Sequence, residues 1–296
     1  MPLNYAEPQG TALAHRVCEK NIRGLNTAWL EAGTAGRPIV MMLHGFPDSA
    51  ECWDRQIDFF AEDYHVVAPY VRGAKPSEPS RDMDRYSPEA IALDFLDILL
   101  EVNPERDQPV FIVGHDLGGV PAWQLARLIQ SRAAGLVIIN SLTIKQMFRR
   151  FKQPRQLLKS WYMLPMQVPK IPELLMRRFP IYFLDAAHSA GELQGAARPG
   201  LSSLRGALAG PMNQYRTFLR AIPKELRQKQ KRLQTPVLVL WGSDDAFLVP
   251  PTLDEMETEA EKVTVRILPG NHWIHRSESV QVNKLMAEFF ATRGAS

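Results

Sequence analysis

The sequence has very few cysteines: Cys18 and Cys52 are the only two in 296 residues. Two cysteines are too few for the disulfide framework that stabilises small secreted domains. Long apolar runs are also missing, because the N-terminal stretch MPLNYAEPQG has no signal-peptide core and no later run approaches the roughly 20 residues of a membrane span. We therefore expect a cytoplasmic protein without a membrane-spanning segment.

A large excess of charge of either sign is absent as well. The formal net charge is +3, which gives no indication of a nucleic-acid partner. Basic residues gather in RRFKQPR (149–155) and KELRQKQKR (224–232), and such short runs are typical of solvated helix faces and loops. The sequence also lacks a G-x-G-x-x-G fingerprint and a clustered set of His and Cys ligands, so neither an organic cofactor nor a metal is predicted.

What the chain does contain is a series of compact apolar runs that alternate with helical patterns. The runs are PIVMMLHG, HVVAPY, PVFIVGHD, AGLVIINS, PVLVLWGS and VTVRILPG, and helix-like segments such as SPEAIALDFLDILLEV lie between most of them. Continuous apolar strands separated by helices predict a mostly parallel sheet that is covered on both faces. Two further segments, HRVCEKN and LNTAWLEAG, predict a hairpin around Arg23-Gly24.

One region interrupts this alternation. Between residues 143 and 223 the sequence contains prolines, arginines, methionines and aromatic residues in helix-length pieces, without a convincing strand. We therefore predict an α/β core formed by residues 1–142 and 224–296, with an inserted helical cap over residues 143–223. A chain of this length is sufficient for one large α/β domain with such an insertion.

The motif with the clearest chemical meaning is VGHDLGG, which contains Asp116. It follows the apolar run PVFIV and precedes the helix-like segment PAWQLARLIQ. A strand, a sharp turn flanked by glycines and a helix form the setting of a nucleophile elbow, which raises one side chain above a sheet. Esterases place serine there, whereas this chain has aspartate. The simpler interpretation is an aspartate that only caps the following helix.

Further motifs occur in a consistent order with this one: HGFP at residues 44–47, the segments around Tyr162 and Tyr215, WGSDD ending at Asp245, and GNHW with His272. Together they resemble the epoxide hydrolase branch of the α/β-hydrolase fold, over nearly the full length of the chain. The resemblance implies a mostly parallel central sheet, flanking helices and a helical cap. It also implies hydrolysis of an epoxide to a vicinal diol without a cofactor.

The resemblance assigns the role of nucleophile to Asp116. A carboxylate that attacks a saturated carbon forms an alkyl ester, which water can then hydrolyse, whereas a serine would form an inert ether. His272 is expected to be the general base that activates this water. His275, three residues later, is a second candidate for the base.

The acid that orients the histidine is expected to be Asp245. In the family it stands third after the glycine that ends the preceding strand, here Gly242. Asp244 competes with it for this role. The alternative location in some relatives, after AGLVIIN, offers Asn140 and no carboxylate.

The HGFP segment resembles the oxyanion loop of the same family. The backbone N–H groups of Phe46 and Leu117 are expected to converge and to stabilise the negative charge that develops when water attacks the Asp116 carbonyl. Pro47 is expected to hold the shape of this loop, through a cis peptide bond.

Two tyrosines in the predicted cap favour epoxide opening over other chemistry on this scaffold. Opening the ring leaves an alkoxide, and the hydroxyl groups of Tyr162 and Tyr215 can donate to it, whereas Tyr182 in FPIYFLD is expected only to pack. An apolar pocket is expected, which indicates a lipophilic epoxide as the small-molecule substrate. Its expected lining is Trp161, Met163, Met166, Phe46 and Leu117.

Two alternative functions remain open. Haloalkane and haloacid dehalogenases share the scaffold but tend to carry tryptophan or arginine directly after the nucleophile, where this chain has Leu117. Many epoxide hydrolases also have tryptophan there, and Trp161 could act as an indole donor to a halide. The other alternative is a catalytically silent binding protein, which would not need the complete Asp–His–Asp set. The sequence leaves open whether the protein is a monomer or a homodimer.

Overall fold

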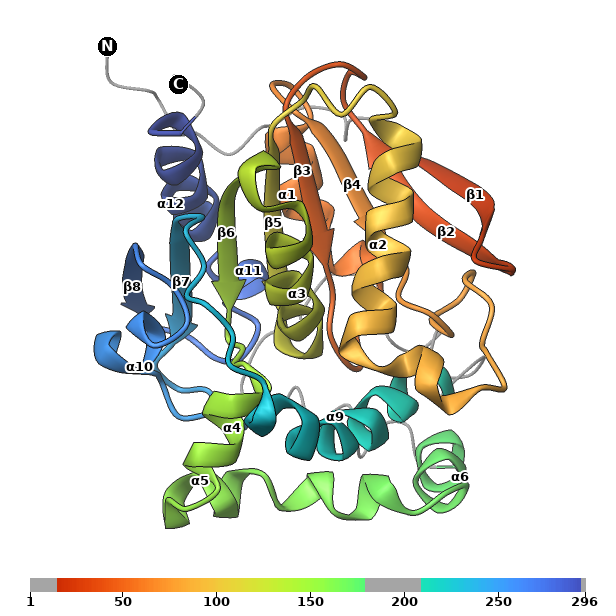
Figure 1. Cartoon of the computed structure of the whole chain (residues 1–296), viewed down its shortest axis with the longest axis vertical. Coiled ribbons are helices and arrows are strands. Elements are labelled where there is room, and N and C mark those ends of the chain that lie inside the picture. The colour runs from red at the N-terminus through yellow and green to blue at the C-terminus, as the bar shows by residue number, and fades with distance from the viewer. Residues whose placement is uncertain (1–14, 179–208, 294–296) are drawn as a thin grey trace.

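The computed structural model describes residues 15–178 and 209–293. In this part of the chain the strands form one eight-stranded sheet with the order β1-β2-β4-β3-β5-β6-β7-β8 (Figure 1). The strands are β1 (Arg16–Ile22), β2 (Leu25–Ala32), β3 (Ile39–Leu43), β4 (His65–Pro69), β5 (Val110–His115), β6 (Ala133–Ile139), β7 (Val237–Gly242) and β8 (Val263–Leu268). β1 and β2 form an antiparallel hairpin, β2 is antiparallel to β4, and the strands from β3 to β8 pair in parallel. The predicted hairpin and parallel strands are confirmed.

The central strands are apolar along their length because both faces of the sheet are covered. In β3, Ile39, Met41 and Leu43 pack into one hydrophobic cluster, whereas Val40 and Met42 pack into a second cluster on the opposite face. Successive side chains of a strand point to opposite faces, so a strand covered on both sides needs apolar residues at every position. This explains why the sequence shows continuous apolar runs.

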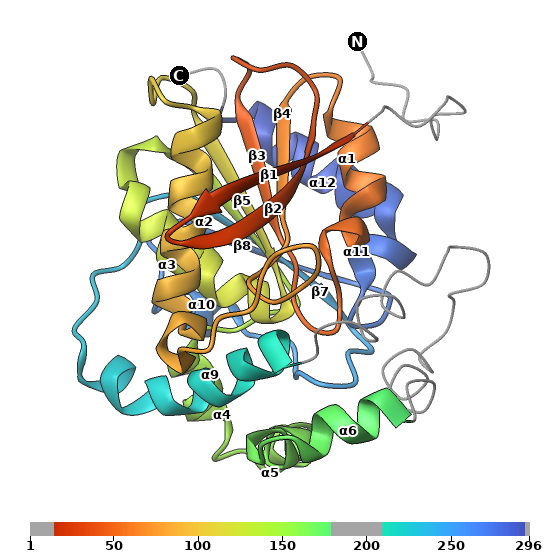
Figure 2. The ribbon, with the colours of Figure 1, turned by 90° about the vertical axis from the view of Figure 1, so that its right-hand side faces the viewer.

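Helices form the two covering layers. Helices α2 (Pro88–Val102) and α3 (Gly119–Ile129) cover one face, and α1 (Asp54–Phe60) and α12 (Ser279–Ala291) cover the other (Figures 1 and 2). The start of α2 follows directly from its sequence, because the side chain of Ser87 accepts a hydrogen bond from the N–H of Ala90 and Pro88 stands in the first turn.

A third group of helices lies beyond the carboxyl ends of the parallel strands (Figure 1). It begins with a capping box in which Thr143 and Gln146 each bind the other's backbone N–H. The group contains α4 (Ile144–Arg150), α5 (Pro154–Lys159), η5 (Trp161–Met163), η6 (Pro165–Gln167), α6 (Ile171–Arg178) and α9 (Ala209–Arg227). Because α9 contains Pro223 and continues to Arg227, it extends beyond the predicted cap boundary at residue 223. Tyr182 lies outside the described residues.

Short helices complete the architecture. They are η1 (Ala50–Trp53), η2 (Met83–Tyr86), η3 (Asp116–Gly118), η4 (Gln130–Arg132), α10 (Leu253–Glu257) and α11 (Ile274–Ser277). Within residues 15–178 and 209–293, we find no helix whose length and apolar character would allow it to cross a membrane. The loops that follow β3, β5, β6, β7 and β8 all reach the same edge of the sheet, next to the third group of helices (Figure 1).

Candidate active site

The turn after β5 presents Asp116 at the carboxyl edge of the sheet. Asp116 has a φ of 51°, in the left-handed region that costs an ordinary residue backbone strain. The turn also depends on close packing, because a Cβ on Gly118 would lie 2.4 Å from the carbonyl oxygens of Leu43 and His44. The sequence thus forms the strand, sharp turn and helix of a nucleophile elbow.

The Asp116 carboxylate is held on one side by backbone donors. The N–H of Phe46 donates to Oδ1 over 2.9 Å. A Cβ on Gly45 would lie 2.4 Å from that oxygen, so a glycine is required at this point of the oxyanion loop. Burial alone would raise the pKa of Asp116. The opposite effect of His272 and of the N–H of Leu117 is larger, so the pKa of Asp116 lies below its ordinary value. Asp116 is therefore ionised at neutral pH. The structure places the backbone N–H groups of Phe46 and Leu117 beside Asp116, and the Phe46–Pro47 peptide bond is cis.

His272 lies between two carboxylates. Its Nε2 is 3.3 Å from Oδ2 of Asp116, and its Nδ1 is 2.8 Å from Oδ2 of Asp245. Burial lowers the pKa of His272, but the two carboxylates outweigh burial and raise the pKa to about 10. In this arrangement the imidazole is protonated at neutral pH and forms two ion pairs.

Asp245 is positioned by three hydrogen bonds besides the one with His272. The N–H groups of Phe247 and Leu248 donate to Oδ1 over 2.7 and 2.9 Å, and Nδ2 of Asn140 donates to Oδ2 over 2.7 Å. Burial raises the pKa of Asp245, but His272 and these donors bring it below its ordinary value. The neighbouring Asp244 is exposed and does not face the histidine.

Asn140 is a site residue whose role the sequence did not reveal. It follows β6, has a φ of 44°, and is fully buried against Asp245. Sequence reasoning considered this position only as a possible source of the acid. The sequence signal for such a role is the position of Asn140 directly after a buried strand, at the edge of the sheet where functional groups gather.

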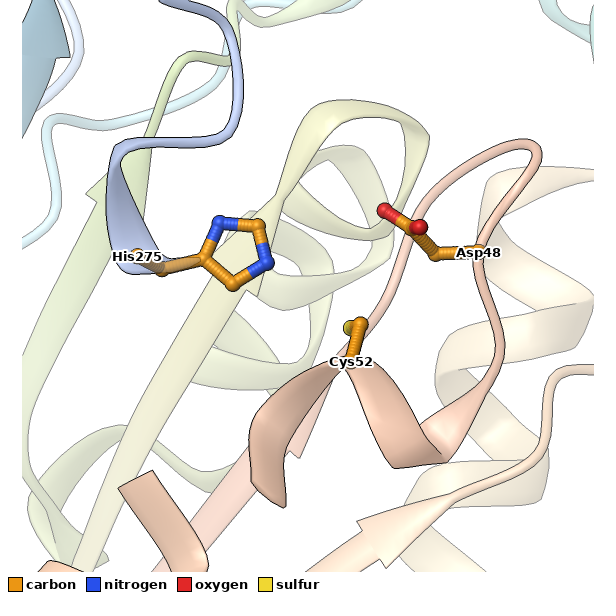
Figure 3. A group of neighbouring side chains, drawn as sticks. All are labelled: Asp48, Cys52 and His275. Atoms are coloured by element: carbon orange, nitrogen blue, oxygen red, sulfur yellow. The ribbon is translucent and has the colours of Figure 1, made fainter. Parts of the chain in front are cut away.

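The other histidines of the motifs do not face the Asp116 carboxylate. His275 is buried on the far side of His115, beside Asp48 and Cys52 (Figure 3). His115 donates through Nε2 to the carbonyl oxygen of His272 over 2.9 Å, and burial lowers its pKa to about 3. Of the two candidates for the base, only His272 is in contact with Asp116 in this geometry.

Two tyrosines from the third group of helices lie opposite Asp116. Tyr162 comes from η5 and Tyr215 from α9, and their rings meet edge to face with centroids 6.0 Å apart. Their hydroxyl groups are hydrogen-bonded to each other, and burial raises the pKa of both, so both are protonated at neutral pH. Both tyrosines and Asp116 line the same cavity.

This cavity is mainly apolar. Of the five predicted lining residues, Met163 and Leu117 line the cavity, whereas Phe46, Trp161 and Met166 are not among its lining residues. Trp161 is 67% exposed, because the three residues of η5 point in different directions. Its indole therefore does not face the cavity and is not placed to donate to a halide bound there. Met166 is buried elsewhere. Lining residues that the sequence did not reveal are Val120, Ser141, Leu142, Met147, Phe218 and Leu248.

Residues 40–285 match the model of the alpha/beta hydrolase family. Human epoxide hydrolase 4 is 30% identical over 288 residues, which cover 90% of this chain and 76% of that protein. Mouse epoxide hydrolase 3 is 29% identical, with coverage of 90% and 74%.

Solved structures support the same fold. An epoxide hydrolase from Bacillus megaterium in complex with an inhibitor aligns with a TM-score of 0.79 and 23% identity, covering 93% of this chain and all of that chain. A putative acyltransferase from Salmonella enterica aligns with a TM-score of 0.82 and 20% identity, covering 97% and 98%. Likeness at this level of identity shows the fold and not the reaction. The chain is a hydrolase that belongs to the alpha/beta hydrolase family.

Proposed function

We propose that this protein is an epoxide hydrolase that converts a lipophilic epoxide into a vicinal diol through an ester on Asp116. One observation carries the proposal: an ionised carboxylate at the elbow faces the tyrosine pair across an apolar cavity, and His272 adjoins the same carboxylate. The similarity to epoxide hydrolases from human and mouse supports the same activity.

The first step is ring opening. Oδ1 of Asp116 is engaged by the N–H of Phe46, which leaves Oδ2 to attack the epoxide carbon. The new carbon–oxygen bond forms as the ring C–O bond breaks, and the Tyr162–Tyr215 pair protonates the ring oxygen. Because burial raises the pKa of both hydroxyl groups, they remain protonated until an alkoxide develops beside them.

The second step depends on a change of charge. The ester on Asp116 is neutral, so one of the two anions that keep His272 protonated is lost and the pKa of His272 falls. The proton that His272 releases replaces the one that the tyrosines gave to the ring oxygen. The neutral imidazole can then take a proton from water.

The resulting hydroxide attacks the ester carbonyl. The N–H groups of Phe46 and Leu117 stabilise the oxyanion. The bond between the Asp116 carbonyl carbon and the bridging oxygen then breaks, whereas the bond between that oxygen and the substrate carbon stays intact. The second proton of the water goes to the departing diol oxygen. Asp116 and protonated His272 are thereby restored, and no net proton is consumed.

Residues 143–223 act as the cap in this proposal. Both tyrosines belong to this stretch, and η5 and α9 bring them over the end of β5. Asp245 stays on the core side and holds the histidine in the tautomer that donates from Nδ1. The cap thus supplies the acid of the first step, and the core supplies the nucleophile and base.

A substrate panel tests the proposal. Purified protein should form diol from an aryl or alkyl epoxide such as styrene oxide, and should release little halide from matched haloalkanes or fluoroacetate. Rapid halide release with inert epoxides would instead identify a dehalogenase. Inertness toward both classes would contradict the proposal and favour a catalytically silent binding protein.

A further inference from the structure

Behind the catalytic residues, three side chains of different chemistry meet in the protein interior. Asp48, Cys52 and His275 are buried, and their potential ligand atoms all lie within 4.8 Å of one another (Figure 3). His275 is fully buried, and within the described part of the chain neither of its ring nitrogens has a hydrogen-bond partner. Figure 3 shows one of these nitrogens facing the space next to Asp48 and Cys52. A buried polar atom without a partner costs about 1–3 kcal/mol, so this arrangement calls for a ligand.

The chemistry of the three side chains selects the ligand. A thiolate, an imidazole and a carboxylate are the groups that bind Zn²⁺ in proteins. Asp48 is oriented for such a role, because the indole Nε1 of Trp273 donates to its Oδ2 over 2.9 Å. We propose that Asp48, Cys52 and His275 form a buried zinc site.

Zinc would draw the side chains together. With bonds of about 2.0–2.3 Å, the ligands of a tetrahedral zinc ion lie roughly 3.5 Å apart, so small side-chain rotations complete the site. His115 offers a further donor, since its Nδ1 is 3.7 Å from Oδ2 of Asp48 and has no hydrogen-bond partner among the described residues. It can supply the fourth ligand.

The location gives the site a structural role. Asp48 and Cys52 belong to the segment that follows the oxyanion residue Phe46, and His275 belongs to α11, directly after His272. A zinc ion therefore links the loop that binds the oxyanion to the loop that carries the base.

Metal analysis and cobalt spectroscopy test this proposal on the full-length protein. We expect about one zinc per chain by mass spectrometry, a lower Tm after treatment with a chelator, and recovery of the Tm when ZnCl₂ is added. Cobalt added to the chelated protein should produce a thiolate-to-metal charge-transfer band. That band should persist in Cys18→Ser, whose cysteine lies in β1 beside Glu31, and disappear in Cys52→Ser.

His275→Gln provides a variant that leaves both cysteines in place. It should retain the fold but lose the recovery of Tm with zinc. Wild-type protein without stoichiometric metal, without a cobalt–thiolate band and without a change of Tm on addition of zinc overturns the proposal. An equal cobalt band in Cys52→Ser also overturns it, because the metal then binds elsewhere.

An independent observation concerns the outer surface of residues 157–175, here called the outer cap face. Large apolar side chains are unusually exposed on it, including Leu158 at 74%, Leu164 at 69% and Trp161 at 67%. Apolar exposure that gathers in one segment marks an interaction surface. The full set is Leu157, Leu158, Trp161, Leu164, Val168, Ile171, Leu174 and Leu175.

The charges around this face indicate what binds it. Residues 143–175 contain at least partly exposed lysines and arginines at 145, 149, 152, 155, 159 and 170, whereas Arg150 is buried, and Glu173 is the only acidic residue in this stretch. Glu173 is buried and pairs with Arg216 over 2.8 Å, so it does not offset the exposed basic charge. Apolar side chains flanked by basic ones suit the interface of an anionic bilayer. We infer that the outer cap face binds to membranes that contain anionic phospholipids.

The tryptophans provide a local reporter for this interaction. Trp161 is exposed, whereas the other five of the six tryptophans in the chain are buried. Vesicles of phosphatidylcholine and phosphatidylglycerol should therefore shift the fluorescence of Trp161 to shorter wavelength and sediment with the protein. Vesicles of phosphatidylcholine alone should do so much less, and salt should weaken the binding.

Two variants make the test specific. Leu158→Ser combined with Leu164→Ser should abolish sedimentation with anionic vesicles, whereas Leu128→Ser, on the exposed side of α3, should leave it unchanged. Absence of binding to anionic vesicles overturns the inference. A concentration-dependent shift of Trp161 fluorescence without lipid, together with dimers in analytical ultracentrifugation, would assign this face to a second copy of the chain instead.

Discussion

Replacing Asp116 by asparagine tests whether the charge of the nucleophile controls the protonation of the base. Asparagine has nearly the shape of the carboxylate but no charge, so it imitates the neutral ester. In the folded protein the pKa of His272 is about 10, against an ordinary value of 6.5, although burial alone would lower it. Because one pKa unit corresponds to about 1.36 kcal/mol, the attraction of the two carboxylates outweighs burial by several kcal/mol.

Loss of one nearby opposite charge lowers a pKa by about 1–3 units. In Asp116→Asn the pKa of His272 should therefore fall to a value from about 7 to about 9. The fall can be measured by NMR titration of ¹⁵N-labelled histidine. Asp116→Ala should show the same direction, and Asp244→Asn, which removes an exposed carboxylate next to Asp245, should leave the titration unchanged. An unchanged pKa in Asp116→Asn would refute the proposed coupling.

The same shift affects stability. Because the pKa of His272 is raised in the folded state, its contribution to the free energy of unfolding is fully present below pH of about 6.5 and is lost as pH rises through about 10. In Asp116→Asn, His272 should contribute less to the free energy of unfolding, and this contribution should be lost at a lower pH than in the wild-type protein. Urea unfolding at a series of pH values measures both curves. Curves of identical shape would contradict the assignment of the ion pairs.

Four further substitutions test the parts of the site. Tyr162→Phe and Tyr215→Phe should each slow ring opening by about 10²–10³, measured in single turnovers, and full activity in the double variant would disprove their role. Asn140→Ala should lower the free energy of unfolding by about 1–3 kcal/mol and slow ester hydrolysis more than ring opening, because it releases Asp245; equal effects on both steps would argue against this. Gly45→Ala should abolish activity in a folded protein, as judged by circular dichroism, because its Cβ would lie 2.4 Å from the nucleophile's Oδ1.

The fold was predictable because its signals are local. The apolar runs match β3 to β8. In strands that are covered on both faces, such as β3 and β7, each position needs an apolar residue, whereas the edge strand β8 is partly exposed. The elbow was predictable for a similar reason: Asp116 and Gly118 lie two positions apart in the sequence, and the sharp turn constrains both. Likewise, Asp245 and His272 each follow a strand, so the common edge of a parallel sheet brings them together.

The remaining features depend on contacts that sequence spacing does not encode. Trp161 and Tyr162 are neighbours in η5, yet one is exposed and the other lines the cavity, because a single short turn has no clear periodicity. Arg150, expected on a solvated basic face, is buried and pairs with Glu255 instead. The cluster around Cys52 joins residues more than 200 positions apart. Such contacts follow from the packing of distant loops and not from local patterns.

Oxygen labelling during one turnover tests the central claim most directly. With enzyme in excess over epoxide in ¹⁸O-water, we predict that the label enters Asp116 and that the first diol remains mostly unlabelled, because the added oxygen comes from the carboxylate. His272→Gln should accumulate an adduct on the peptide containing Asp116, heavier by the mass of the epoxide, and Asp116→Ala should form none. Label in the diol from the first turnover would mean direct attack by water and would contradict the ester mechanism.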